Sequence, residues 1–192
     1  MRTSGKPKRY RASSAGQAGW GITWGRNEAS QLVEFAFLLP LLLVLAVGVG
    51  DFSSAFVLRD KLTNAAREGA RISIGQPTAD LTQPNPLTVQ AARDAVVNYL
   101  NNAGVPATLT GTSPCSAPPG TFSWTYCLSN SGQIRIERQF LVSVGGTLVL
   151  STRVTVSYPY AWSFGRVAGL LGSSTFSNSF TLSSQSVMQN LR

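Results

Sequence analysis

The sequence has no histidine and only two cysteines among its 192 residues. Without histidine the chain lacks the commonest general base and the commonest zinc ligand, which excludes Ser-His-Asp and Cys-His arrangements. It also has neither a GxxxxGK[ST] phosphate loop nor a glycine fingerprint between a strand and a helix. We therefore expect no enzyme, no metal site, no cofactor and no small-molecule substrate.

Charged residues are also scarce, at 12% of the chain against 43% hydrophobic residues, and the net charge is +8. A basic balance is compatible with nucleic acid or anionic lipid as a partner. Arg135, Arg138 and Arg153 are the bases that an uptake role for DNA would use, beside aromatic residues. A solvated basic face is the simpler interpretation, so nucleic acid is not the expected partner.

What the chain does have is an uncharged apolar run of sixteen residues, from Phe35 to Gly50. As a helix it would cover roughly 24 Å, short of the ~30 Å hydrocarbon core, so a span must include its flanks. We expect a transmembrane helix over residues 30–58, followed by a domain over residues 59–192. A buried helix of a soluble protein is the alternative by composition alone.

A cleavable secretion signal is the more serious alternative, with Ser53-Ser54-Ala55 as its cut site. The sequence after the run, DFSSAFVLRDKL, continues in helical period, which favours a retained anchor. Residues 1–29 hold six Lys and Arg against one acid. Bases that flank a span stay in the cytoplasm. We therefore expect a single-pass protein of the cytoplasmic membrane, with a disordered or cleaved tail inside and the C-terminal domain exported.

Two residues inside the anchor need explanation. Glu34 is an acid at the edge of an apolar helix, and such acids are costly unless paired, which makes Glu34 a functional candidate. A glutamate reaching to water at the interface is the simpler alternative. Pro40 removes one backbone hydrogen bond and predicts a helix kink. Both features are typical of a helix that packs against other membrane helices.

The pattern SQLVEFAFLLPLLL, followed by DF and then LTNAAREGAR, resembles the TadE-like family of pseudopilins. These proteins belong to tight-adherence (Flp) type IVc pilus systems. The resemblance is specific over residues 29–74 and extends to the rest of the chain only in general plan. It implies a non-catalytic protein that acts in pilus assembly or a related secretion system.

The resemblance also implies residue roles. Prepilin peptidase would cut between Ala29 and Ser30, with Ala29 in the position where the family usually has glycine. Glu34 would then be the fifth mature residue and would pair with the freed α-amino group of a neighbouring subunit, because pairing offsets the cost of burying either charge. The implied partners are the membrane, prepilin peptidase, other pilin-like subunits and the tight-adherence assembly platform.

The remainder predicts an α+β domain. The anchor helix continues as a stripe that includes Leu58, Leu62, Ala65, Gly69 and Ile72, and it stops at Gly75-Gln76-Pro77. A second helix follows after a proline-rich loop, with Thr88 as N-cap, Gly104 as C-cap, and a buried face listed here: Val89, Ala92, Val96 and Leu100.

A loop with one short strand comes next, and in an oxidising compartment Cys115 and Cys127 would close it as a disulfide. Alternating apolar residues on both sides of Gly145-Gly146 predict a β-hairpin that Pro159 ends. Tyr160, Trp162 and Phe164 would cap the sheet's core or form an exposed binding face, and Phe180, Leu182 and Met188 suggest a last strand. A secreted or anchored surface protein with a structural role and no pilus partner remains the alternative function.

Overall fold

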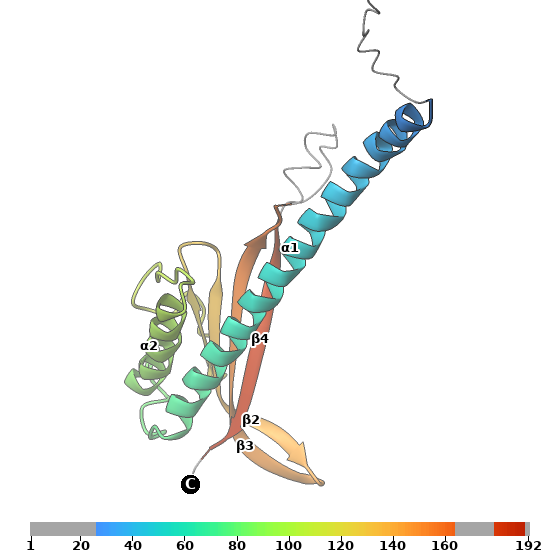
Figure 1. The fold of residues 1–192 in the computed structure, drawn as a ribbon. Helices are drawn as coiled ribbons and strands as arrows, with labels where there is room; N and C mark the ends of the chain where they lie inside the picture. Colours follow the sequence, from blue (N-terminus) through green and yellow to red (C-terminus); the bar gives the residue numbers. More distant parts are fainter. Residues whose placement is uncertain (1–25, 164–178, 191–192) are drawn as a thin grey trace, which may run out of the picture. The chain divides into compact units, whose positions relative to one another are not determined.

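The computed structural model describes residues 26–163 and 179–190. It contains α1 (Arg26–Ile74), α2 (Leu87–Asn102), β1 (Ser123–Cys127), β2 (Gln133–Val144), β3 (Thr147–Ala161) and β4 (Ser179–Gln189). The predicted α+β class, with a long N-terminal helix, a second helix and an antiparallel sheet, is confirmed (Figure 1). Of the expected tail, residues 1–29, the last four residues are helical at the start of α1. Residues 1–25, Phe164 and the expected loop up to Asn178 lie outside the described residues.

By its contacts the chain divides into residues 1–41 and residues 42–192. In the first unit the described part is the beginning of α1, where every described side chain from Ser30 on is exposed. The second unit contains the rest of α1, α2 and the sheet, and it holds the hydrophobic core.

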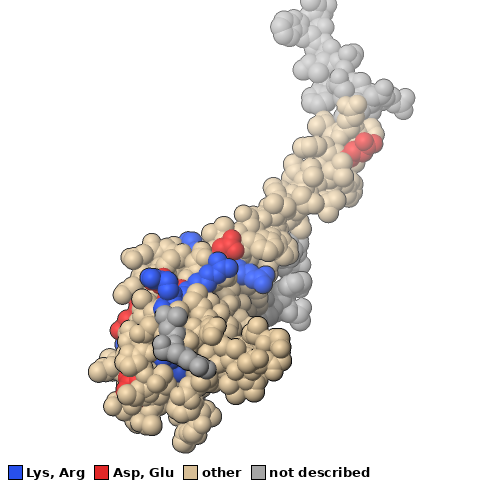
Figure 2. All heavy atoms as spheres, turned by 90° about the horizontal axis from the view of Figure 1, so that it is seen from below, with Lys and Arg blue, Asp and Glu red and all other residues tan. Residues whose placement is uncertain are grey.

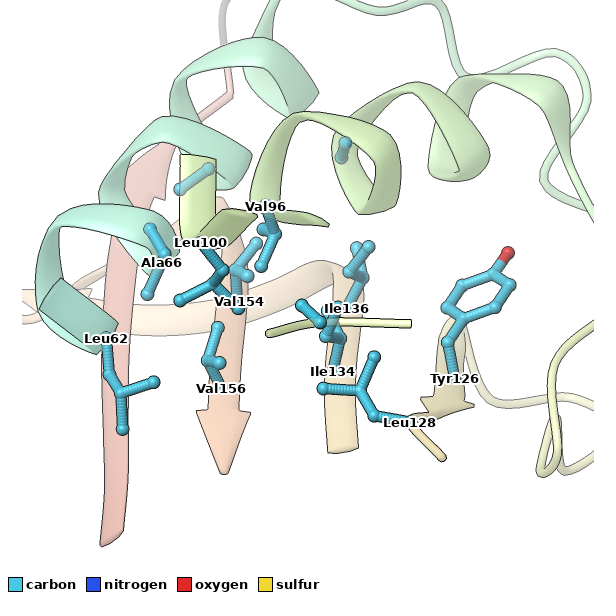
Figure 3. Close-up of a cluster of buried hydrophobic side chains, with 14 of the residues drawn as sticks. Leu62, Ala66, Val96, Leu100, Tyr126, Leu128, Ile134, Ile136, Val154 and Val156 are labelled. Atoms are coloured by element: carbon cyan, nitrogen blue, oxygen red, sulfur yellow. The ribbon is translucent and has the colours of Figure 1, made fainter. Parts of the chain in front are cut away.

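The sheet is an antiparallel meander in the order β1-β2-β3-β4. Ile136 of β2 lies between Trp124 of β1 and Val154 of β3 in the register, so alternate residues of neighbouring strands share one face. The part of α1 after the apolar run and α2 pack on that face, as the labelled side chains of both helices and of the sheet show in Figure 3. The predicted apolar face of α2 is buried along its whole length.

Small residues let α1 approach the other elements closely. Leu62, Ala65, Ala66 and Ala70 are completely buried. Gly69 faces α2, where a Cβ atom would lie 2.5 Å from Cγ2 of Val96. The predicted stripe is therefore the core face of α1, and the helix ends at Ile74, before the predicted Gly-Gln-Pro stop.

The start of α2 corrects one prediction. Pro86 is the N-cap and Thr88 lies inside the helix, so Thr88 is not the cap. Asp80 supplies the missing acceptor from the preceding loop: its Oδ2 accepts from the Thr88 N–H at 3.0 Å and its Oδ1 from the Thr88 hydroxyl at 2.6 Å. A carboxylate here also complements the positive end of the helix dipole.

At its other end α2 finishes in a Schellman motif. Ala103 is the C-cap, and the glycine that was predicted to cap the helix, Gly104, follows it with φ +74. The N–H of Val105 donates to the carbonyl of Leu100 at 2.8 Å, and that of Gly104 to Asn101 at 3.0 Å. Only glycine takes this left-handed conformation without strain.

Pro159 does not end β3, contrary to prediction, because the strand runs on to Ala161. The pairing with β2 stops at Ser157, so Pro159 pairs only with Thr181 of β4. One side of β3 has no strand beside it at this position, and a proline is tolerated where no donor is needed.

The alternation predicted along all of β2 is also wrong beyond Glu137. The register shifts between Glu137 and Phe140, with Gln139 at φ 59, so two residues of β2 oppose one of β3. The bulge exchanges the faces of the following residues. Beyond it the hairpin arm, residues 140–151, pairs only with itself for most of its length and exposes large apolar side chains, namely Leu141, Val144, Leu148 and Leu150.

Candidate membrane helix and its junction with the sheet

The first half of α1 presents apolar side chains to its surroundings. Exposed large residues follow one another from Leu32 to Val57, with Phe37 at 80% and Val49 at 63% exposure. This stretch is long and apolar enough to cross a membrane, and its most apolar part has no buried residue. A water-soluble helix would hide such a surface, so its exposure is consistent with a single-pass membrane protein.

The residues predicted to act in processing and assembly all lie in this half. Ala29 and Ser30 are in the helix, and Ser30 is exposed. Glu34 is exposed among apolar neighbours and has no hydrogen bond or ion pair within the described residues. α1 continues as a helix on both sides of Pro40, so the kink there stays a prediction.

Four aromatic rings meet where α1 passes the ends of β3 and β4, and we call this cluster the aromatic junction: Phe52, Tyr160, Trp162 and Phe180. The ring of Trp162 is stacked on Phe180 at 4.9 Å and meets Phe52 edge-on at 5.4 Å. The Tyr160 hydroxyl donates to the backbone carbonyl of Asp51 at 3.0 Å, and Asp51 is 5% exposed.

Sequence reasoning considered Tyr160 and Trp162, but it missed the other two rings of the junction. Phe52 belongs to the end of the apolar run, where it looks like one more lipid-facing residue. No local pattern connects it to residues more than a hundred positions away. The structure brings together α1, β3 and β4 at this point, and Thr63 of α1 bonds Ser184 of β4 at 2.9 Å further along.

At the other end of α1, Arg138 is buried, although it was a candidate for an exposed basic face. It donates to the Ser73 hydroxyl at 3.2 Å and to the Gln76 carbonyl at 3.0 Å, and so satisfies groups at the end of the helix. Arg138 follows Ile134 and Ile136 in the alternation of β2, so it lies on the buried face of the strand. Burial lowers the pKa of Arg138, while the charge of Asp80 acts in the opposite direction.

Asp80 completes this end of the domain. Burial by itself would raise the pKa of its carboxyl group, but the hydrogen bonds from Thr88 and the charge of Arg138 lower the pKa overall. The carboxylate therefore stays ionised while it caps α2. The arrangement links the end of α1, the start of α2 and β2 through charged and polar side chains.

Among the described residues, several of the other bases are paired with acids. Arg153 is paired with Glu137 and lies over the ring of Phe140, and Arg71 is paired with Glu68. In the face that Figure 2 shows, Lys and Arg side chains gather together with Asp and Glu. Arg135 alone of the three candidate bases is well exposed. This mixture gives little support to a surface that tracks a nucleic-acid backbone.

Cys115 and Cys127 form a disulfide that joins the loop before β1 to the end of that strand. The same loop is held by backbone hydrogen bonds, including that from the Cys115 N–H to the Thr125 carbonyl at 2.8 Å. Disulfides are typical of proteins outside the reducing cytosol.

The geometry of α1 agrees with a comparison against known families. Residues 29–71 match the family model of TadE-like proteins. The resemblance read from the anchor motif is thereby confirmed for this segment, which covers α1 nearly to its end. The match indicates a protein related to the Tad pilus with an N-terminal helix able to span a membrane. No curated protein and no solved structure matches the chain.

The TadE-like segment presents two different surfaces along one helix. Its first part presents Glu34 and apolar side chains outward, and its second part packs Leu62, Ala66 and Gly69 against the domain. The TadE-like family is a structural family associated with pili, and no catalytic role follows from the match. Within the described residues no group of three or more His, Cys, Asp or Glu side chains could hold a metal ion.

Proposed function

We propose that this protein is a membrane-anchored, pilin-like subunit that acts without catalysis in the assembly of a tight-adherence (Flp-type) pilus or a related secretion system. The observation that carries the proposal is the exposed, uncharged surface of α1 around Glu34, in the segment that matches TadE-like proteins. Glu34 has no partner among the described residues, and an acid in an apolar helix surface is costly unless paired, so pairing with a group of another chain would stabilise it.

In this proposal the basic tail stays in the cytoplasm and prepilin peptidase cuts between Ala29 and Ser30. The cut frees an α-amino group that is charged near neutral pH. The carboxylate of Glu34 in a neighbouring subunit would form an ion pair with that amino group within the bilayer. Because one pair of opposite charges is far cheaper to bury than two single ones, the pair would fix the register of the two helices.

The N-terminal residue of the protein from native membranes tests the processing step, read by intact mass. Ser30 as the first residue would support the proposal and give Glu34 its mature position. Cleavage close to Ala55 would contradict it and indicate a secreted domain. An intact N-terminus would retain the anchor but contradict pilin-type processing.

The structure bears on the secretion-signal alternative. Ala55 lies within α1 and is only 8% exposed. The nearby Asp51 carbonyl accepts a hydrogen bond from Tyr160 of β3, and the ring of Phe52 contacts that of Trp162, the residue after β3. A cut at Ala55 would remove the α1 side of the aromatic junction. These contacts favour a mature protein that keeps residues 51–55.

The second candidate function is a surface protein with a structural role and no pilus partner. It is distinguished from the first by deletion of the gene and counting of surface pili. Loss of pili, restored by the wild-type gene, would support the pilus role, whereas normal piliation would favour the surface protein.

A further inference from the structure

We propose that the aromatic junction binds the headgroup and glycerol region of the phospholipid bilayer on the exported side, and so sets the depth at which α1 crosses. The occupant is lipid, not another protein. The inference rests on the proposed function in one respect, because α1 must span the membrane for the junction to reach lipid.

The first argument is continuity with the apolar surface of α1. Phe52 is 59% exposed and Phe56, four residues later and so on the same side of the helix, is 61% exposed. Val57, beside Phe56, is 52% exposed. The surface expected to contact acyl chains therefore runs without interruption into the junction.

The second argument is the change of chemistry at this level of α1. Between Phe35 and Gly50 the helix has no charged residue, and the next acid, Asp51, is buried. Charged residues resume at Arg59 and Asp60, both exposed, about two turns after the junction. An apolar surface that gives way to charges within two turns is expected where a helix leaves a bilayer.

The third argument is the chemistry of the rings. Tyrosine and tryptophan combine an apolar ring with one polar group, and both are enriched at membrane interfaces for that reason. Trp162 and Tyr160 come from the end of β3, so they belong to the sheet and not to the helix. The hydroxyl of Tyr160 is satisfied by the Asp51 carbonyl, which fixes its ring beside α1.

Because the junction joins the sheet to α1, lipid bound there would also fix the position of the sheet relative to the bilayer, which a single aromatic residue on α1 would not do. The ring of Trp162 packs against those of Phe52 and Phe180, so these ends of β3 and β4 lie at the same level of α1 as the end of the expected span. Lipid bound there would hold the described residues of the domain after the span, 59–163 and 179–190, at the bilayer surface.

Depth-dependent fluorescence quenching of Trp162 tests the inference. The full chain is reconstituted in phosphatidylcholine–phosphatidylglycerol vesicles whose acyl chains are brominated either near the headgroup or near the chain end. The signal of Trp162 is the difference between the wild type and Trp162→Phe, which cancels Trp20, Trp24 and Trp124. Trp124→Phe is the matched control, because Trp124 is 3% exposed in the core.

We expect bromines near the headgroup to quench the Trp162 signal at least twofold more than bromines near the chain end. The same preference should be found when the difference is taken between Trp124→Phe and the double variant Trp124→Phe, Trp162→Phe. A Trp162 signal that aqueous acrylamide quenches and brominated lipid does not would overturn the inference. So would a signal shielded from both quenchers, which would indicate a protein contact.

A second reporter covers the case in which Trp162→Phe does not fold. Phe56→Trp places an indole on the same side of α1 as Phe52, and its added fluorescence should show the same preference for headgroup-proximal bromines. Equal quenching at both depths would count against the inference. Extraction with alkaline carbonate separates the two proposals: release of the protein from vesicles contradicts the membrane span itself, whereas retention with an aqueous Trp162 contradicts only the lipid-bound junction.

Discussion

A methyl group added at Gly69 of α1 would lie 2.5 Å from Cγ2 of Val96 in α2, closer than two carbon atoms can approach. The two helices therefore pack backbone against side chain at this point, and the next two nearest atoms, the Ala92 carbonyl oxygen and Cγ1 of Val154, are each 3.4 Å away. There is no space into which a side chain could turn.

Gly69→Ala is expected to lower the free energy of unfolding by about 1–3 kcal/mol, because the added methyl forces the helices apart in a packed core. Chemical denaturation in detergent measures it. Gly111→Ala is the control, since nothing lies within 4 Å of its Cβ position. If the overlap is the cause, Gly69→Ala and Val96→Ala together should cost less than their sum, and strict additivity would argue against it.

Replacing Asp80 should destabilise the start of α2 in a pH-dependent way. Asp80→Ala removes both hydrogen bonds to Thr88 and should cost about 0.5–2 kcal/mol at neutral pH, as for loss of a helix cap. The folded-state pKa of Asp80 is lowered, so its contribution is complete above the unfolded-state value of about 4. It is lost as the pH falls through the lower, folded-state pKa.

The difference in stability between wild type and Asp80→Ala should therefore shrink below about pH 4. Thermal unfolding at a series of pH values measures it. Asp60→Ala, at an exposed position of α1, should change stability little at any pH. A difference between wild type and Asp80→Ala that stayed constant down to pH 2 would show that the charge of Asp80 is not involved.

Arg138→Ala should destabilise the domain by about 2–4 kcal/mol, because it leaves the Ser73 hydroxyl and the Gln76 carbonyl at the end of α1 without their donor. Arg135→Ala offers a matched control on the same strand, where the side chain is exposed. Denaturant unfolding compares the two. Equal effects at both positions would refute the buried role of Arg138.

Removal of the disulfide should also lower stability. Replacing both Cys115 and Cys127 by serine frees a loop with a sequence separation of 12 residues, which costs on the order of 2–3 kcal/mol in the chain-entropy model. The unfolding midpoint of the wild type should fall to that of the variant when reductant is added. No response to reductant would mean that the bond is absent from the native protein.

Glu34→Ala should leave membrane insertion unchanged, because it removes a charge from an apolar helix surface, and yet abolish incorporation into pili. Quantitative immunoblotting of sheared pili and of membranes measures both. Asp60→Ala, an acid of α1 after the apolar run, should assemble normally. Normal incorporation of Glu34→Ala would remove the assembly role of Glu34 and favour a surface protein without a pilus partner.

The elements with strong local patterns could be predicted from the sequence. The uncharged run predicted the apolar first half of α1, the spacing of Leu62, Ala65 and Gly69 predicted the core face of α1, and alternation around Gly145-Gly146 predicted the hairpin. In each case one face of the element has one environment along its length, so residue spacing carries the information.

The features that sequence reasoning missed depend on contacts between distant residues. Gln139 takes a left-handed conformation that nothing about glutamine predicts, and the bulge at this point exchanges the faces of the residues beyond it. Asp80 caps α2 from eight residues before Thr88, outside any local capping pattern. The aromatic junction likewise becomes visible only when β3 and β4 are placed beside α1.

The continuity of α1 from Leu42 to Ile74 has a mechanical consequence. No slack connection separates the stretch that exposes apolar side chains from the stretch that packs Leu62 and Ala66 into the core. A pull on the sheet parallel to α1 is therefore resisted in shear, by all the contacts along the helix at once. Tension on the domain would therefore reach the apolar stretch of α1 without first unfolding a flexible linker.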